Sequence, residues 1–190
     1  MEDMKYYETD KGTPQGGLIS PILANVYLHY VLDLWVEKFI KPRSKGEVYY
    51  VRYADDFILM FQYEEEAVYF LEALDKRLKE FGLELELNKT KITPFGRFKG
   101  TKENFSFLGF TFYNGKTTTG KYRPIVHTDK NKLKQKRCNV KKWLWEFMHY
   151  PIIVVGRKLK KKLIGHYIYY GVNGNYLALV SFYKYIKYTW

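Results

Sequence analysis

The chain has few of the features that mark secreted, membrane-spanning or zinc-stabilised proteins. Its 190 residues include one cysteine, Cys138, which excludes an internal disulfide and a Cys-x-x-Cys zinc site. The longest apolar run, residues 22–40, is interrupted by charged residues and is a poor candidate for a bilayer span. The first residues do not resemble a signal peptide. These absences favour a reduced, intracellular, cytoplasmic location. Four histidines are scattered without metal-ligand spacing, and we assign them no chemistry: His29, His127, His149 and His166.

Acidic residues are in the minority. The chain has 32 Lys and Arg against 20 Asp and Glu, a formal net charge of +12 and a pI near 9.5. A basic chain is attracted to phosphate, and that binding weakens as salt rises. A solvated lysine surface would give the same composition. The 19 tyrosines, many interleaved with lysines in the C-terminal third, favour RNA because bases stack on aromatic rings.

Two adjacent carboxylates, Asp55 and Asp56, lie between two apolar runs. Residues 48–51 precede them and residues 57–61 follow, and both runs are rich in the β-branched and aromatic residues of strands. The pattern predicts a hairpin of two buried strands with the acidic pair at its tip. Hard cations such as Mg²⁺ prefer carboxylate oxygens, so the pair is a candidate metal site. The alternative is a solvated Asp-Asp turn.

The remaining periodicity predicts an α+β fold in residues 1–126. Residues 22–39 indicate a largely buried helix, with Ser20 as its N-cap and Pro21 as its first residue. Apolar positions at helical spacing in residues 67–81 predict a second helix that ends at Gly82. Alternation at residues 83–87 predicts a strand. Residues 105–113 and 121–126, joined through Asn114-Gly115 and a Thr/Gly stretch, predict a hairpin. We expect an antiparallel sheet with helices against one face.

Residues 127–190 are predicted to form a small three-helix bundle. Thr128-Asp129 resembles a helix cap, Pro151 marks a second helix start, and Gly171 to Asn175 turn the chain into a last helix. Basic residues recur on the outward faces beside aromatic ones, which favours contact with RNA over an ordinary solvated surface.

Several segments, in order, resemble one family. Gly12 to Pro21 form a glycine-rich Gly-Thr-Pro-Gln-Gly-Gly loop, and Arg52 to Asp56 read Arg-Tyr-Ala-Asp-Asp. Residues 82–92, the turn Phe107 to Phe110 and residues 165–175 continue the likeness over nearly the whole chain. Together these motifs resemble the reverse transcriptases encoded by group II introns, the maturase family.

The resemblance implies a partial polymerase palm in residues 1–126 and a helical thumb, the maturase-type RNA-binding region, in residues 127–190. The chain would then be part of a bacterial RNA-directed DNA polymerase that extends a primer with dNTPs on an RNA template and also binds intron RNA. Mg²⁺, or Mn²⁺ in its place, would be the cofactor, with two ions roughly 4 Å apart.

The resemblance also implies roles for individual residues. Asp55 and Asp56 would bind metal, and Lys89 would approach the triphosphate unless it is merely a surface lysine. The residues near nucleotide and template would be Pro14, Gln15, Gly16, Gly17 and Tyr53, although Tyr53 would serve equally well as a packing aromatic. The primer grip would be Phe107, Leu108, Gly109 and Phe110, of which the two phenylalanines would also suit a core. The RNA-binding residues would be Lys132, Lys136, Arg137, Lys141, Arg157, Lys158 and Lys161.

One departure from the family bears on activity. Only residues 1–11 precede the glycine-rich loop, where the family has its fingers and a further metal-binding Asp. We therefore expect this polypeptide by itself to be inactive, unless a separate N-terminal piece or self-association completes it. The alternatives are a noncatalytic RNA-binding maturase module and another palm-type enzyme such as a nucleotide cyclase, which would need neither a primer grip nor a basic thumb.

Overall fold

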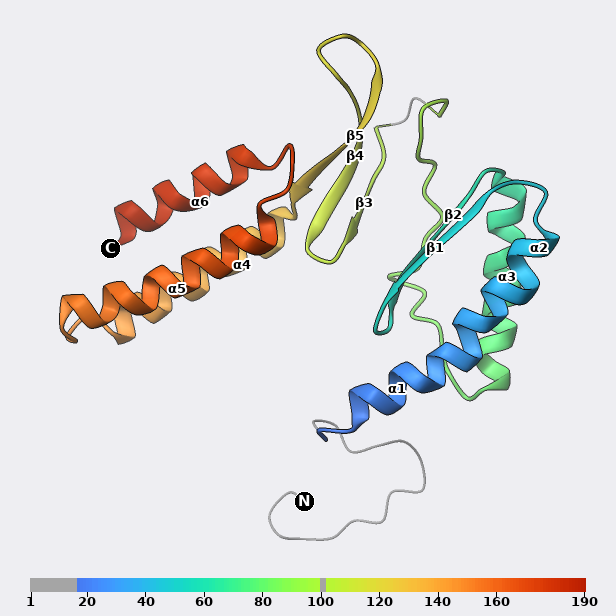
Figure 1. Ribbon diagram of the computed structural model, residues 1–190, viewed down its shortest axis with the longest axis horizontal. Coiled ribbons are helices and arrows are strands. Elements are labelled where there is room, and N and C mark those ends of the chain that lie inside the picture. Colours follow the sequence, from blue (N-terminus) through green and yellow to red (C-terminus); the bar gives the residue numbers. More distant parts are fainter. Residues whose placement is uncertain (1–16, 100–101) are drawn as a thin grey trace, which may run out of the picture. The chain divides into compact units, whose positions relative to one another are not determined.

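The computed structural model describes residues 17–99 and 102–190 and divides the chain into two compact units between Ile92 and Thr93 (Figure 1). Both units combine helices with antiparallel strands, which confirms the predicted α+β class. This division lies upstream of Val126, the expected end of the palm. The assignment of palm and thumb stays a prediction.

The first unit begins with a helical stretch whose character changes along its length. It comprises α1 (Ser20–Leu28), the π-helical turns η1 (His29–Asp33) and η2 (Val36–Ile40), and α2 (Lys41–Arg43). Ile19 is the N-cap and Ser20 is already helical, so the predicted cap was one residue late.

The prediction that this helical stretch is largely buried was wrong. Val31, Leu32 and Val36 are buried, whereas no residue of α1 is, and the side chain of Ile22 is 63% exposed. The physical reason is that only residues 31–40 of this stretch pack in the core of the unit.

That core lies between the helical stretch, a hairpin and a second helix. Strands β1 (Val48–Tyr53) and β2 (Asp56–Phe61) pair antiparallel, and α3 (Glu64–Glu80) follows them. Figure 1 shows the helical stretch and α3 on the same side of this hairpin. The predicted hairpin and helix are confirmed, although the strands are half-buried rather than buried. The helical residues of the core are Val31, Leu32, Val36, Phe70, Leu74 and Leu78.

The predicted strand at residues 83–87 is absent. Leu83 and Leu85 pack against the core while Leu87 is 72% exposed, and the backbone there belongs to no sheet. Alternation of apolar and polar residues indicates which side chains pack against an apolar neighbour. It does not supply the partner strand that a sheet needs.

The second unit contains the three-stranded sheet β3 (Asn104–Phe107), β4 (Phe110–Lys116) and β5 (Tyr122–Thr128), in the order β3-β4-β5. The predicted single strand at 105–113 is therefore broken by a turn at Leu108-Gly109. Asn114 and Gly115 lie inside β4 rather than in a turn. The chain reverses instead at residues 117–120, where Gly120 has a φ of +79° that favours glycine.

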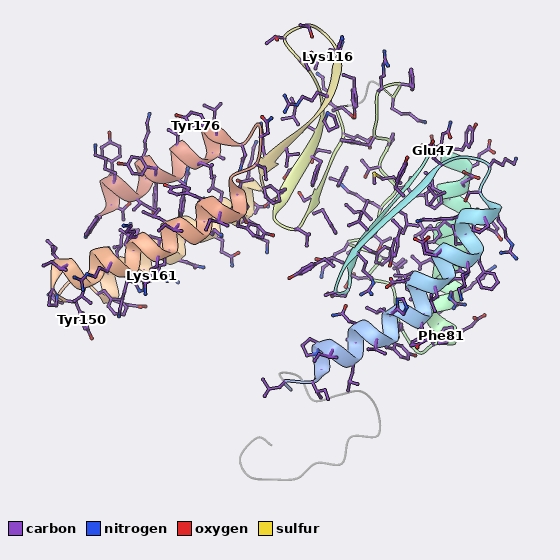
Figure 2. The ribbon with its side chains drawn as sticks, viewed as in Figure 1. Glu47, Phe81, Lys116, Tyr150, Lys161 and Tyr176 are labelled. Carbon is purple, nitrogen blue, oxygen red and sulfur yellow. The ribbon has the colours of Figure 1, made fainter. Side chains whose placement is uncertain are left out.

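The predicted helical bundle is confirmed. Helices α4 (Lys130–Glu146), α5 (Ile152–Tyr170) and α6 (Tyr176–Thr189) pack around Leu144, Val155, Leu159, Phe182 and Ile186. Asp129 caps α4 as expected, since its carboxylate accepts a hydrogen bond from the Lys132 amide at 2.9 Å. Figure 2 labels Tyr150, in the connection between α4 and α5, and Tyr176, the first residue of α6. Within the described residues, every helix is too short or too polar to cross a membrane.

Candidate functional site

The acidic pair lies at a tight reversal between β1 and β2. Tyr53 pairs with Asp56, so Ala54 and Asp55 form the two-residue turn. Ala54 has a φ of +54°, a conformation that is disfavoured for a residue with a Cβ atom. Both aspartates are exposed. The chain therefore presents two neighbouring carboxylates to solvent on a constrained turn.

The helical stretch and β1 meet beside this turn through a charged pair that the sequence analysis missed. The Arg52 guanidinium donates from Nε to Asp33 Oδ1 and from Nη2 to Asp33 Oδ2, both at 2.7 Å. The Tyr50 hydroxyl donates to Asp33 Oδ1 at 2.6 Å, and His29 Nδ1 lies 3.2 Å from Oδ2. The side chains of Arg52 and Asp33 are only 11% and 20% exposed. This pair is the best-shielded ion pair among the described residues.

These contacts shift the pKa values of Asp33 and Tyr50. Hydrogen bonding from Arg52, assisted by Tyr50 and His29, outweighs desolvation and lowers the pKa of Asp33 from 3.8 to about 2. Burial, together with the hydrogen bond to Asp33, raises the pKa of Tyr50. Asp33 is therefore ionised at neutral pH, and both of its carboxylate oxygens already accept hydrogen bonds from within the unit. It is not a candidate metal ligand.

Arg52 also makes hydrogen bonds to the turn itself and to α1. Its Nη1 donates to the Ala54 carbonyl at 2.8 Å and to Asn25 Oδ1 on α1 at 2.9 Å. One guanidinium thus connects the helical stretch to the backbone of the acidic turn. In the sequence, the only signal of this connection is a lone Asp in an apolar helix and a lone Arg in an apolar strand.

The donor set around the turn suits Mg²⁺ in kind but not in number. Adjacent carboxylates are the hard oxygen ligands that Mg²⁺ prefers, and octahedral coordination needs six such donors. Within residues 17–99 and 102–190, no group of three or more His, Cys, Asp or Glu side chains is placed to hold a metal ion. Asp55 and Asp56 could therefore supply only part of a coordination shell, with the rest from water, substrate or further protein ligands.

Of the other predicted residues of the first unit, Tyr53 and Lys89 are exposed. Pro14, Gln15 and Gly16 lie outside the described residues. Gly17 is described, and its carbonyl accepts a hydrogen bond from the Ser20 amide at 3.2 Å. Tyr53 is 66% exposed beside the acidic turn. Lys89 is exposed in a turn, and its own backbone amide donates a hydrogen bond to the Glu86 carbonyl.

The turn at Phe107 to Phe110 belongs to the second unit and is held from two directions. Leu108 and Gly109 both have positive φ, +48° and +76°. The Tyr169 hydroxyl of α5 donates to the Leu108 carbonyl at 2.9 Å, and the Asp129 amide donates to the Gly109 carbonyl at 2.9 Å. The Phe110 ring stacks on Tyr169 with 5.7 Å between centroids. The predicted primer grip is therefore a hairpin turn that is hydrogen-bonded to α5 and packed against it.

The predicted RNA-binding residues fall into two groups. Lys136 lies 4.4 Å over the Tyr170 ring, and burial lowers its pKa. Arg137 donates to the Ser181 hydroxyl at 2.7 Å and lies over the Tyr185 ring. These two are half-buried and have partners within the bundle. The remaining members are exposed: Lys132, Lys141, Arg157, Lys158 and Lys161, the last of which is labelled in Figure 2.

Comparisons with known proteins cover both units. The sequence profile of the family described as "Reverse transcriptase (RNA-dependent DNA polymerase)" matches residues 2–112. The Group II intron-encoded protein LtrA of Lactococcus lactis subsp. cremoris is 29% identical over 126 residues, covering 57% of this chain and 21% of that protein. Protein YkfC of Escherichia coli (strain K12) is 24% identical over 163 residues, covering 72% of this chain and 41% of that protein. The chain therefore spans less than half the length of these relatives.

Proposed function

Because the chain belongs to the reverse transcriptase (RNA-dependent DNA polymerase) family, we propose that its acidic turn is part of a nucleotidyl-transfer site. The observation that carries the proposal is the presentation of Asp55 and Asp56 on an exposed, constrained turn inside the segment that matches the family. The resemblance to group II intron reverse transcriptases rests on the same segment and on LtrA.

Asp55 and Asp56 would hold Mg²⁺, or Mn²⁺ in its place. When bound, these ions activate the primer 3′-hydroxyl for attack on the dNTP and neutralise charge on the departing pyrophosphate. Asp55 lies in the turn and Asp56 begins β2, so the two carboxylates leave the backbone in different directions and would not share ions equally. Further ligands would come from outside this pair.

The other residues would bind and orient the substrates. Tyr53 is exposed next to the turn and would contact the primer or the nucleotide. Lys89 would stabilise negative charge on the triphosphate. The attached turn Phe107 to Phe110 would contact the primer backbone, and the glycine-rich loop that includes Gln15 would approach the nucleotide and template.

Primer extension tests this proposal. The 190-residue polypeptide is assayed with an RNA template, a DNA primer, dNTPs and Mg²⁺, both alone and with the upstream fingers half of a family member. We expect no incorporation from the polypeptide alone and restored incorporation with the added half. Asp55→Asn should then reduce incorporation by about a hundredfold or more, since metal-based charge stabilisation is worth several kcal/mol.

Asp75→Asn is the matched control, because Asp75 is an aspartate of the same unit that pairs with Lys79 on the exposed face of α3. It should leave incorporation unchanged. Undiminished incorporation by Asp55→Asn, or equal loss in both variants, would contradict the role of the acidic turn.

The exposed basic residues of the bundle favour a second role in binding RNA, including the intron RNA of a group II element. Lys141 and Lys161 are exposed on α4 and α5. Replacing both with Gln should reduce the slope of log affinity against log salt by about 1.5 if each contacts one phosphate. Lys79→Gln, on α3 of the first unit, should leave the slope unchanged. Persistence of RNA binding and splicing support in Asp55→Asn would establish this role as independent of polymerisation.

A further inference from the structure

Arg52 lies two residues before Ala54, the first residue of the acidic turn, and all three nitrogens of its guanidinium donate hydrogen bonds. Two of its nitrogens bind both carboxylate oxygens of Asp33 at 2.7 Å. The third, Nη1, donates to Asn25 Oδ1 and to the Ala54 carbonyl. Asp33 and Asn25 both belong to the helical stretch of residues 20–43. The arginine therefore joins the backbone of the turn to an element that packs in the core of the same unit.

The turn has a reason to need this support. Ala54 adopts a positive φ that a residue with a Cβ atom disfavours, and an unsupported turn would relax toward other conformations. The Ala54 carbonyl belongs to the peptide group that leads directly into Asp55. Fixing that carbonyl restricts the direction in which the Asp55 side chain leaves the chain.

We propose that Arg52 is a positioning residue that holds the Ala54-Asp55 turn against the helical stretch through Asp33 and Asn25. Its effect on metal binding rests on the proposed function, because it acts through Asp55 and Asp56. Its effect on the order of the turn does not rest on that function. Lysine should not replace it, since a single ammonium cannot bind two carboxylate oxygens in a fork while also reaching an amide and a carbonyl.

Two variants of the 190-residue chain separate positioning from general stability. Arg52→Lys keeps the charge and removes the fork. Arg77→Lys is the matched control, because the Arg77 guanidinium donates to the Val31 carbonyl of the same helical stretch at 2.6 Å and lies over the rings of Trp35 and Phe81. Both substitutions disturb the core, and only the first removes a contact to the turn.

Hydrogen exchange of a peptide covering residues 53–58 measures the order of the turn. Arg52→Lys should exchange about tenfold faster there, as expected for the loss of a charge-assisted hydrogen bond. Arg77→Lys should stay within about twofold of the original chain, because it has no contact with the turn. Equal exchange in Arg52→Lys and the original chain, or the same acceleration in Arg77→Lys, would overturn the proposal.

Binding of Mn²⁺, followed by electron paramagnetic resonance, measures the consequence for the carboxylates. Asp55→Asn defines the background. Arg52→Lys should weaken the Asp55-dependent binding by about three- to tenfold, whereas Arg77→Lys should not. If the original chain binds Mn²⁺ no better than Asp55→Asn does, the proposed metal site fails, and the exchange measurement still decides whether Arg52 orders the turn. Unchanged affinity in Arg52→Lys beside a genuine Asp55-dependent site would overturn the positioning role.

Discussion

The ion pair between Asp33 and Arg52 should make the stability of the first unit depend on pH. Asp33→Asn removes the charge and retains nearly the same volume. In the original chain, Asp33 Oδ1 and Oδ2 accept hydrogen bonds from Arg52, and Oδ1 also accepts one from Tyr50. The asparagine variant offers one acceptor oxygen in place of two and leaves a largely buried guanidinium without its counter-charge. We therefore expect a clear loss of stability at neutral pH.

The size of the loss follows from the pKa of Asp33. Hydrogen bonding from Arg52 lowers that pKa from 3.8 to about 2 on folding, and a carboxyl shifted this far contributes about 2 kcal/mol at neutral pH. Because the folded pKa is the lower one, the contribution is fully present above pH 3.8. It is lost as the pH falls from about 4 through 2, and Asp33 is protonated in both states only below that range. The free energy of unfolding of Asp33→Asn should thus be about 2 kcal/mol lower than that of the original chain at pH 7. This difference between the two chains should shrink toward zero as the pH falls through about 2.

Urea unfolding at a series of pH values, followed by the methyl NMR signals of Val31 and Leu74, reports on the core of this unit alone. Asp75→Asn is the control, because the Asp75–Lys79 pair is more exposed than the Asp33–Arg52 pair and should contribute at most about 0.5 kcal/mol. A difference between the original chain and Asp33→Asn that does not change between pH 7 and pH 3 would refute the reasoning. So would a loss in Asp75→Asn as large as that in Asp33→Asn.

Three further substitutions test the local geometry. Ala54→Gly should stabilise the first unit by up to about 1 kcal/mol in urea unfolding, because glycine accepts the positive φ at this position; a loss of stability would contradict the strain. Asn175→Ala should cost about 3 kcal/mol in the second unit, because the buried Asn175 amide exchanges two hydrogen bonds with Thr128 and donates one to the Tyr170 carbonyl. Gly109→Ala should lower the melting temperature, since its Cβ would lie 2.8 Å from the Tyr170 hydroxyl at a φ of +76°, and Tyr170→Phe in the same chain should recover part of the loss. The absence of any recovery would place the cost in the backbone alone.

The features that the sequence predicted correctly are those that short-range patterns encode. The hairpin of residues 48–61 follows from two apolar runs around a polar pair, and α3 follows from helical spacing that ends at Gly82. Asp129 caps α4 because its own side chain can reach the Lys132 amide three residues later. In each case the residues that decide the structure are neighbours in the chain.

The features that sequence reasoning missed depend on distant partners. Asp33 and Arg52 are 19 positions apart. No pattern in either apolar run predicts that these two residues form an ion pair. The burial of residues 22–39 was overestimated for the same reason, because apolar composition does not say whether a neighbour covers it. Asn114-Gly115 is a common hairpin turn, but pairing with β5 keeps both residues in a strand, so the tertiary register overrides the local preference.

The two turns predicted for function share one construction. Among the described residues, Ala54 and Leu108 are the only non-glycine residues with positive φ, and each is the first residue of a two-residue hairpin turn. Each also offers its carbonyl to a long polar side chain, Arg52 in one case at 2.8 Å and Tyr169 in the other at 2.9 Å. Disfavoured backbone conformations persist only where the surroundings hold them, and they gather at functional sites. This shared support of a strained turn is a physical reason, separate from the family resemblance, to expect both turns to act on a ligand.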